Sequence, residues 1–387
     1  YWFVDARATL PGGIPVVPPL TINGIGGGAY YHVKKNGDDA MTIGKTTFPN
    51  YIPDEKTGLG LRAAVMFNAV SNEVLNGEAS LEIAFNNSGG LNYIGLFGYA
   101  KFLGKLPFEE DLNHINNTFN TINRENAKAS SSLETDKQNN PTQAASKILP
   151  MPSQAQSGLT ACLGIQYDFK QSSFHANFDV YVNVIGGLIK GVGANNRAGG
   201  AVIHIAPGEW YVHMGTPNNR IGLQMGIGSI NVKTESYFMT GSSIPGSPPP
   251  PQQVADILGV SMHELDYMRD LNALGDGRGF AFGSSLSVNT GDITFLILYA
   301  NFQAGLGFDI MLKEYKDRYC KGSSSPMGIN GWYANGQAYA YLQGELGVKV
   351  RLWFIKARIP IIKGAAAALL QAKLPNPSWF RGYLGVN

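Results

Sequence analysis

The chain has 387 residues, enough for more than one hydrophobic core, and a formal net charge of +2. This small charge argues against a protein that binds nucleic acid or an anionic membrane surface by electrostatics. Charged residues make up 15% of the chain and glycine occurs 48 times, a composition that favours extended β structure with tight turns.

The two cysteines, Cys162 and Cys320, are too far apart for a metal-binding or redox motif. Either both are free, or they form one long-range disulfide. The sequence contains no run of 18 apolar residues, so a transmembrane helix is not predicted. The chain begins without Met and ends in strand-like sequence, residues 379–386, so we expect a segment of a longer polypeptide that continues beyond Asn387.

Residues 1–103 form a predicted N-terminal β region. From Leu59 onward, apolar and polar residues alternate with a period of two, and turn signals at Asn76-Gly77 and Gly89-Gly90 predict a three-stranded meander. The glycine-rich run 24–29 resembles a dinucleotide-binding fingerprint. It is followed by strand-like sequence where that fingerprint needs a helix, so we interpret it as a turn or bulge.

Residues 104–157 are rich in Asn, Ser, Thr, Gln and Lys, and they are predicted to form a polar linker or long loop, with a helix possible at 108–127. Strand patterns resume in a middle β region, 158–245, where Pro207-Gly208 predicts a hairpin turn. Residues 246–276 form a proline-rich connector with helices. A capping box, Ser261 with Glu264, predicts a helix that ends near Leu274.

Residues 277–387 form a predicted C-terminal region of long strands. Its longest alternating stretch, 331–358, places Leu342, Leu346 and many alanines on one face, with Tyr, Gln, Glu and Lys on the other. We expect the apolar face to be buried in a sheet core and the polar face to contact water.

No complete catalytic or metal-binding motif is present. Histidines occur in pairs, such as His204 with His213 near the hairpin, whereas a zinc site needs three or four ligands. No nucleophile elbow occurs, and the carboxylates are scattered. The sequence therefore predicts no catalytic residue, no metal, no cofactor and no enzyme activity.

Aromatic side chains on the polar face of the longest strand are the candidate interface, because Tyr and Trp are enriched at protein interfaces. The alternative is cross-strand pairing with polar neighbours. Together with two aromatics of the last strand, the interface candidates are Tyr333, Tyr339, Tyr341, Trp353, Trp379 and Phe380.

Several stretches resemble very large, poorly characterised surface or secreted proteins of Bacteroidetes-type bacteria. These stretches are residues 208–211, 215–223, 237–239 with the prolines at 248–251, 329–336 and 370–377. The resemblance implies a region of a longer chain that is exported to the cell envelope or beyond. It identifies no catalytic residue.

The sequence thus predicts an all-β fold, mainly antiparallel, with long amphipathic strands in large sheets and a short helical insertion. The favoured function is a non-enzymatic scaffolding segment of an extracellular or cell-surface assembly, with other protein chains or further parts of the same polypeptide as partners. An outer-membrane β-barrel or translocation component is one alternative, although the small residues of the long strand favour a packed surface over lipid. A glycan-binding or glycan-cleaving module is another.

Overall fold

A computed structural model describes residues 1–35, 51–69, 74–102, 158–244, 246–269, 277–295, 297–315, 318–319, 321–322, 324–352 and 355–387. The predicted linker 104–157, the helix at 108–127, Cys320 and Trp353 lie outside these ranges. Within them, no helix is long and apolar enough to cross a membrane.

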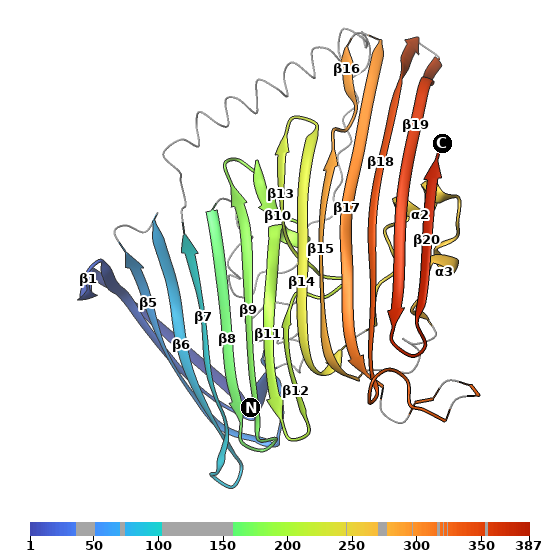
Figure 1. The fold of residues 1–387 in the computed structure, drawn as a ribbon. Helices are drawn as coiled ribbons and strands as arrows, with labels where there is room; N and C mark the ends of the chain where they lie inside the picture. The colour runs from blue at the N-terminus through green and yellow to red at the C-terminus, as the bar shows by residue number, and fades with distance from the viewer. Residues whose placement is uncertain are drawn as a thin grey trace.

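One antiparallel sheet of 18 strands dominates the structure (Figure 1). In chain order, its strands are β1 (Trp2–Val17), β2 (Leu20–Tyr31), β5 (Thr57–Ala69), β6 (Leu75–Asn86), β7 (Leu91–Phe102), β8 (Gly158–Asp168), β9 (Ser173–Val184), β10 (Ile189–Gly191), β11 (Arg197–Ala206), β12 (Glu209–Met214), β13 (Ile221–Ile227), β14 (Ile230–Ile244), β15 (Gly277–Asn289), β16 (Ile293–Phe295), β17 (Leu298–Glu314), β18 (Trp332–Leu352), β19 (Ile355–Leu374) and β20 (Trp379–Val386). Two further strands, β3 (Val33–Lys35) and β4 (Tyr51–Pro53), pair only with each other. The predicted all-β fold is confirmed.

Nearly all strands pair with their neighbours in sequence, so the sheet is an extended meander. The Pro207-Gly208 hairpin is confirmed: it joins β11 to β12, with Gly208 at φ 84°, where a side chain would be strained. The stretch 331–358 is a hairpin and not one strand, because β18 ends at Leu352 and β19 begins at Ile355. At about 3.3 Å per residue, the 21 residues of β18 span roughly 70 Å.

The helical insertion lies between β14 and β15. Helix α2 spans Gln252–Leu258 and helix α3 spans Met262–Leu265; a 3₁₀ turn, η2 (Ala194–Asn196), precedes β11. The predicted capping box is present, since the Ser261 hydroxyl accepts a hydrogen bond from the Glu264 amide at 3.2 Å. Helix α3 ends at Leu265, because Asp266 has non-helical dihedral angles, and the predicted helix end near Leu274 lies outside the described residues.

The two faces of the sheet can be followed from strand to strand, because directly paired residues point to the same side. One face, here called the inner face, carries Tyr30, Glu82, Asp179, Asp309 and Gln371. The opposite, outer face carries large apolar side chains. Both α2 and α3 pack on the inner face, against β18, β19 and β20.

Burial is the reverse of what the alternation in β18 predicts. On the outer face, Leu342 is 50% exposed and Leu346 is 40% exposed, whereas Asn335 and Gln337 on the inner face are each 3% exposed. The prediction of a buried apolar face and a wet polar face is therefore wrong. Period-two alternation shows that a strand has two unlike faces, but it does not show which one the fold covers.

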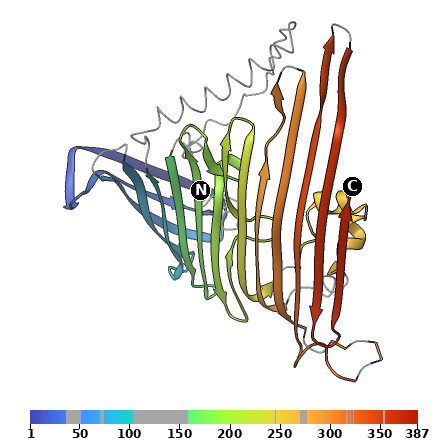
Figure 2. The same cartoon turned by 45° about the horizontal axis from the view of Figure 1, so that its top comes forward.

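The sheet is curved, and β1 passes behind the middle strands in Figures 1 and 2. Helices α2 and α3 lie behind β19 and β20, toward the same side. The inner face is thus the concave face. Among the described residues, the sheet has two edges, since β1 pairs only with β2 and β20 pairs only with β19.

Tyrosines on the inner face lie across glycines of the neighbouring strand. The directly paired residues are Tyr30 with Gly60, Tyr237 with Gly283, Tyr299 with Gly347, Tyr339 with Gly307 and Tyr341 with Gly305. A Cβ atom added at any of these glycines would lie within 2.7 Å of the tyrosine ring. Glycine therefore provides the space in which each ring lies flat over the next strand.

This packing predicts that Gly60→Ala is destabilising. A Cβ at Gly60 would lie 2.0 Å from the Tyr30 ring, so the ring must leave its place. We expect a loss of about 1–3 kcal/mol in the free energy of unfolding, measured by urea titration with circular dichroism. The control is Gly364→Ala in β19, where no atom lies within 4 Å of the added Cβ. Equal losses in the two variants would contradict the packing.

Candidate functional site on the inner face

The inner face concentrates polar and charged side chains that the sheet buries. Buried examples in the described strands are Thr57, Glu78, Ser80, Glu82, Thr160, Ser173, Asn177, Asp179, Arg197, Asp309, Lys313, Asn335, Gln337 and Gln371. Buried polar groups require partners. The partners come from strands far apart in sequence, and they divide the face into clusters.

The first cluster lies on β1, β2 and β5–β7. Both the Tyr30 and the Tyr93 hydroxyl donate hydrogen bonds to the Glu82 carboxylate, and the two hydroxyl oxygens lie 2.5 Å apart. Four residues before Glu82 in β6, Glu78 accepts hydrogen bonds from Arg7 at 2.9 Å and from Arg62 at 3.1 Å. These contacts tie the first five strands of the sheet together through side chains.

The second cluster is centred on Asp309 of β17, which is 1% exposed. Arg220, from the connection between β12 and β13, reaches its carboxylate at 2.7 Å, and Gln337 donates to the other oxygen at 3.0 Å. The Arg220 guanidinium also lies over the Tyr237 ring, 5.0 Å from its centroid. Because Asp309 is buried, the Arg220 guanidinium supplies the opposite charge that offsets the desolvation of its carboxylate.

Residues 246–269, here called the inner segment, bind to the inner face beside this cluster. Three side chains of the sheet donate to its backbone carbonyls: Gln337 to Pro248 at 3.1 Å, Gln371 to Leu265 at 2.8 Å and Arg381 to Glu264 at 2.8 Å. Apolar contacts accompany these bonds. They join Val254, Ala255, Ile257 and Leu265 of the segment to Tyr339, Ala367 and Leu369 of the sheet.

A third cluster lies near the end of the sheet where β15 turns into β16. Asp292, in that turn, accepts hydrogen bonds from Lys349 at 2.7 Å and Arg358 at 3.0 Å. Partial burial raises the pKa of the Asp292 carboxyl, but the hydrogen bonds from Lys349 and Asn301 have the opposite and larger effect, so this pKa lies below its usual value.

Histidines form a short ladder on β9, β11 and β12. His175 Nδ1 and His204 Nδ1 lie 3.1 Å apart, and His204, Tyr211 and His213 stack in sequence with ring centroids 5.0 and 4.6 Å apart. His204 and His213 thus share a face, as predicted, but Tyr211 separates them. In the described part of the chain, no group of three His, Cys, Asp or Glu residues could hold a metal.

The interface candidates are placed differently from what the sequence suggested. Tyr333 and Tyr339 are only 1% and 8% exposed, and Tyr341 is half-buried beside the inner segment, so these three are packing residues of the inner face. Trp379 is half-buried and stacks on Tyr267 of the inner segment, with ring centroids 6.0 Å apart. Phe380 is 65% exposed on the outer face, as a contact residue requires.

The residues that make up the clusters were not identified from sequence. Glu82, Asp309 and Gln371 have no local motif, because each finds its partners on other strands. One signal was available in the sequence: charged and amide side chains recur at every second position of successive strands. The register of strand pairing then places these side chains on one face of the sheet.

No family model matches the chain, and no curated protein is similar to it. Among solved structures, the chain has a likeness to OmpTdeltaL8, a loop L8 deletion mutant of OmpT, an outer membrane protein of Vibrio cholerae. The sequences are 10% identical, the alignment covers 95% of this chain and 98% of the other, and the TM-score is 0.22.

The prediction that the chain is not an enzyme is corrected here. It followed from the absence of a complete catalytic or metal-binding motif in the sequence. That basis fails, because the scattered carboxylates that the sequence analysis discounted are brought together with phenols and guanidinium groups, as Glu82 and Asp309 show.

The Asp309 cluster predicts a large effect of removing its cation. Arg220→Met leaves a buried carboxylate without its ion-pair partner and should cost about 3–5 kcal/mol in unfolding free energy. Lys233→Met is the control: its pair with Glu235, at 2.8 Å, is 40% and 23% exposed and should contribute less than about 1 kcal/mol. Adding Asp309→Asn to Arg220→Met should restore most of the loss. If it does not, the two residues are not coupled.

The lowered pKa of Asp292 predicts a pH dependence. A carboxyl whose folded-state pKa is lowered stabilises the protein above its unfolded pKa of about 3.9, and this contribution disappears as the pH falls through the lower folded value. Unfolding midpoints measured between about pH 6 and pH 2 should therefore fall less steeply in Asp292→Asn than in the wild type. Parallel curves would show that the pairing with Lys349 does not shift this group.

Proposed function

We propose that this chain is a membrane-embedded β-sheet protein of a bacterial outer membrane. The outer face contacts lipid, and the concave inner face encloses a polar interior in which residues 246–269 are bound. The proposal rests on the inverted polarity of the sheet: large apolar side chains are exposed while carboxylates, amides and guanidinium groups are buried. Water favours the opposite arrangement, whereas a lipid bilayer favours this one.

The apolar surface extends over the whole sheet. Outer-face residues that are at least one-third exposed occur on most strands, and examples are Leu61, Leu81, Leu163, Ile203, Leu223, Phe238, Leu306, Leu342 and Leu370. Isolated exposed leucines are normal in proteins that face water, but a continuous surface of them is not. In contact with the hydrocarbon of a bilayer, these exposed apolar side chains would not carry the unfavourable free energy that contact with water gives them.

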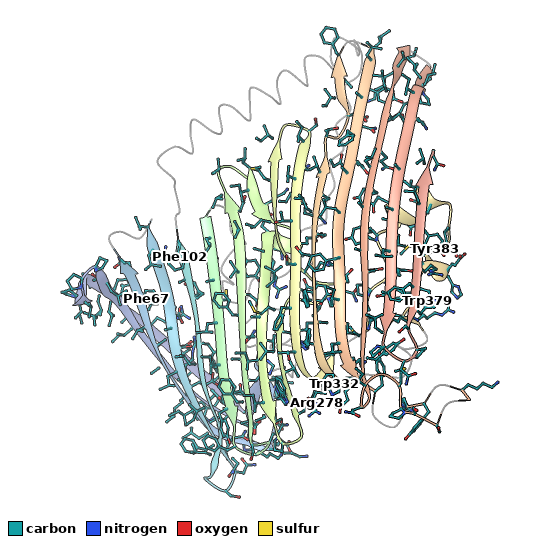
Figure 3. All side chains as sticks on the ribbon, in the orientation of Figure 1. Phe67, Phe102, Arg278, Trp332, Trp379 and Tyr383 are labelled. Atoms are coloured by element: carbon teal, nitrogen blue, oxygen red, sulfur yellow. The ribbon has the colours of Figure 1, made fainter. Side chains whose placement is uncertain are left out.

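Aromatic side chains lie near both ends of the outer face. At one end are Tyr167, Trp210 and Trp332, close to the β8–β9, β11–β12 and β17–β18 connections; at the other are Phe67, Phe102 and Phe295. Figure 3 shows Phe67 and Phe102 at the opposite end of the sheet from Trp332. Two such belts, with an apolar band between them, are typical of outer-membrane sheets.

Strand length supports the same proposal. Strands β5 to β9 have 11 to 13 residues, close to the 9–11 that a tilted strand needs to cross the hydrocarbon core. Strands β17 to β19 are longer and extend past their neighbours at the upper end in Figure 1. The charged cluster at Asp292, Lys349 and Arg358 belongs to this extension, outside the apolar band.

The inner segment suits a structure that closes the interior. It binds the sheet through backbone carbonyls and a modest apolar cluster, while its charged side chains Asp256, Glu264 and Arg269 stay exposed. The prediction of a scaffolding role in a surface assembly remains a hypothesis. The location in a bacterial envelope is a further part of this proposal.

A fluorophore placed on each face tests the proposal. Leu342→Cys and its neighbour Gln343→Cys, each labelled with an environment-sensitive dye, are reconstituted into vesicles that contain acyl-chain quenchers. Leu342 is exposed on the outer face, while Gln343 bonds to Gln303 at 2.7 Å on the inner face. We expect at least a several-fold stronger quenching at position 342. Equal quenching, together with a protein that stays dispersed without detergent, would overturn the proposal.

A further inference from the structure

Within the described residues, the two edge strands of the sheet, β1 and β20, each pair with a strand on one side only. The backbone N–H and C=O of Asn387 both bond to Ala365 of β19, at 2.8 and 3.0 Å. In an antiparallel pair such doubly bonded residues alternate with residues whose backbone groups point away. The groups of Phe380, Gly382, Leu384 and Val386 therefore face the edge of β20, away from β19.

An uncovered edge is incompatible with the proposed location in lipid, and this inference rests on the proposed function. Inside hydrocarbon, each unsatisfied backbone group costs several kcal/mol, so spanning sheets close completely. The side chains at this edge are also among the most exposed of the described residues: Phe380 is 65%, Leu384 81% and Val386 74% exposed. All three lie on the outer face.

The direction of the strands decides what can cover the edge. Strands β10, β13 and β16 continue the columns of β11, β12 and β15, so the 18 strands of the sheet form 15 columns. Every pairing in the sheet is antiparallel, and direction alternates from column to column. The first and fifteenth columns, β1 and β20, therefore run the same way, as the arrowheads in Figure 1 show.

Direct closure of β20 on β1 would thus create a parallel pair in an otherwise antiparallel sheet. A second copy of the chain does not avoid this, because two copies inserted in the same orientation present edges that all run in one direction. An even number of antiparallel strands is the rule for bacterial outer-membrane sheets of one chain. A strand that runs opposite to both edges satisfies the hydrogen bonds of each.

We propose that β20 is a docking edge for one amphipathic β-strand from outside the described sheet, antiparallel to β20. Its outward side chains are apolar, because they continue the surface formed by Phe380, Leu384 and Val386. Helices α2 and α3 project past β20 in Figures 1 and 2, so a strand added there would lie over them. Asn387 donates to the Ile257 carbonyl at 2.9 Å, which fixes α2 at this edge.

Photo-crosslinking in membranes tests the docking edge. Benzoylphenylalanine replaces Phe380 and Leu384 in turn in the full chain, and the crosslinked residues are mapped by mass spectrometry. We expect both probes to reach one alternating apolar–polar strand, with the site reached from Leu384 preceding, in that strand's sequence, the site reached from Phe380. That order is the signature of an antiparallel neighbour.

The control is the same probe at Leu370, which is 57% exposed on the outer face of β19, an interior strand. It should crosslink to lipid alone. Three results overturn the docking edge: crosslinks from β20 to β1, crosslinks in the parallel order, or crosslinks from β20 to lipid alone. A failure of the proposed function is distinguishable, since Leu370 would then give no lipid adduct whatever the edge probes reach.

Discussion

The structure depends on a single constraint: its sheet has its apolar side chains outside and its polar side chains inside. Because most strands obey it, many polar side chains on the concave face are buried and bond to groups of other strands. Glu82 with two tyrosines, Asp309 with Arg220, and Gln371 with the carbonyl of Leu265 are local solutions of that one requirement. The apolar side chains of the convex face need no hydrogen-bond partners.

Inner-face packing explains the composition. A tyrosine that lies flat across the next strand needs a residue without a side chain beneath it, so tyrosines and glycines face each other at Tyr30 with Gly60 and at Tyr339 with Gly307. The same geometry lets the Tyr30 hydroxyl reach Glu82, one strand beyond its direct neighbour. High glycine content and long strands are therefore compatible here, although glycine alone weakens a strand.

Much of the fold could be predicted from the sequence. Alternation located the long strands, Pro207-Gly208 located a hairpin, and Ser261 with Glu264 located a helix start. Which of the two faces is buried could not be predicted. Apolar residues such as Leu342 and polar residues such as Gln337 alternate in the same way whether the apolar face meets a core or lipid. Small residues such as Ala338 and Ala340 were taken as signs of a packed surface, and yet they are exposed on the outer face. The clusters could not be predicted either, since register joins Asp309 to Gln337 and no local spacing does.

Low charge follows from the same constraint. The apolar outer face leaves about half of the strand positions to uncharged residues. On the remaining positions several buried charges have an opposite partner, as Asp179 has in Arg197 and Glu78 has in Arg62. The pairing of opposite charges keeps the net charge near zero. The lack of charged residues on the outer face keeps the total number of charged residues low. A net charge of +2 with 15% charged residues is consistent with this arrangement of the two faces.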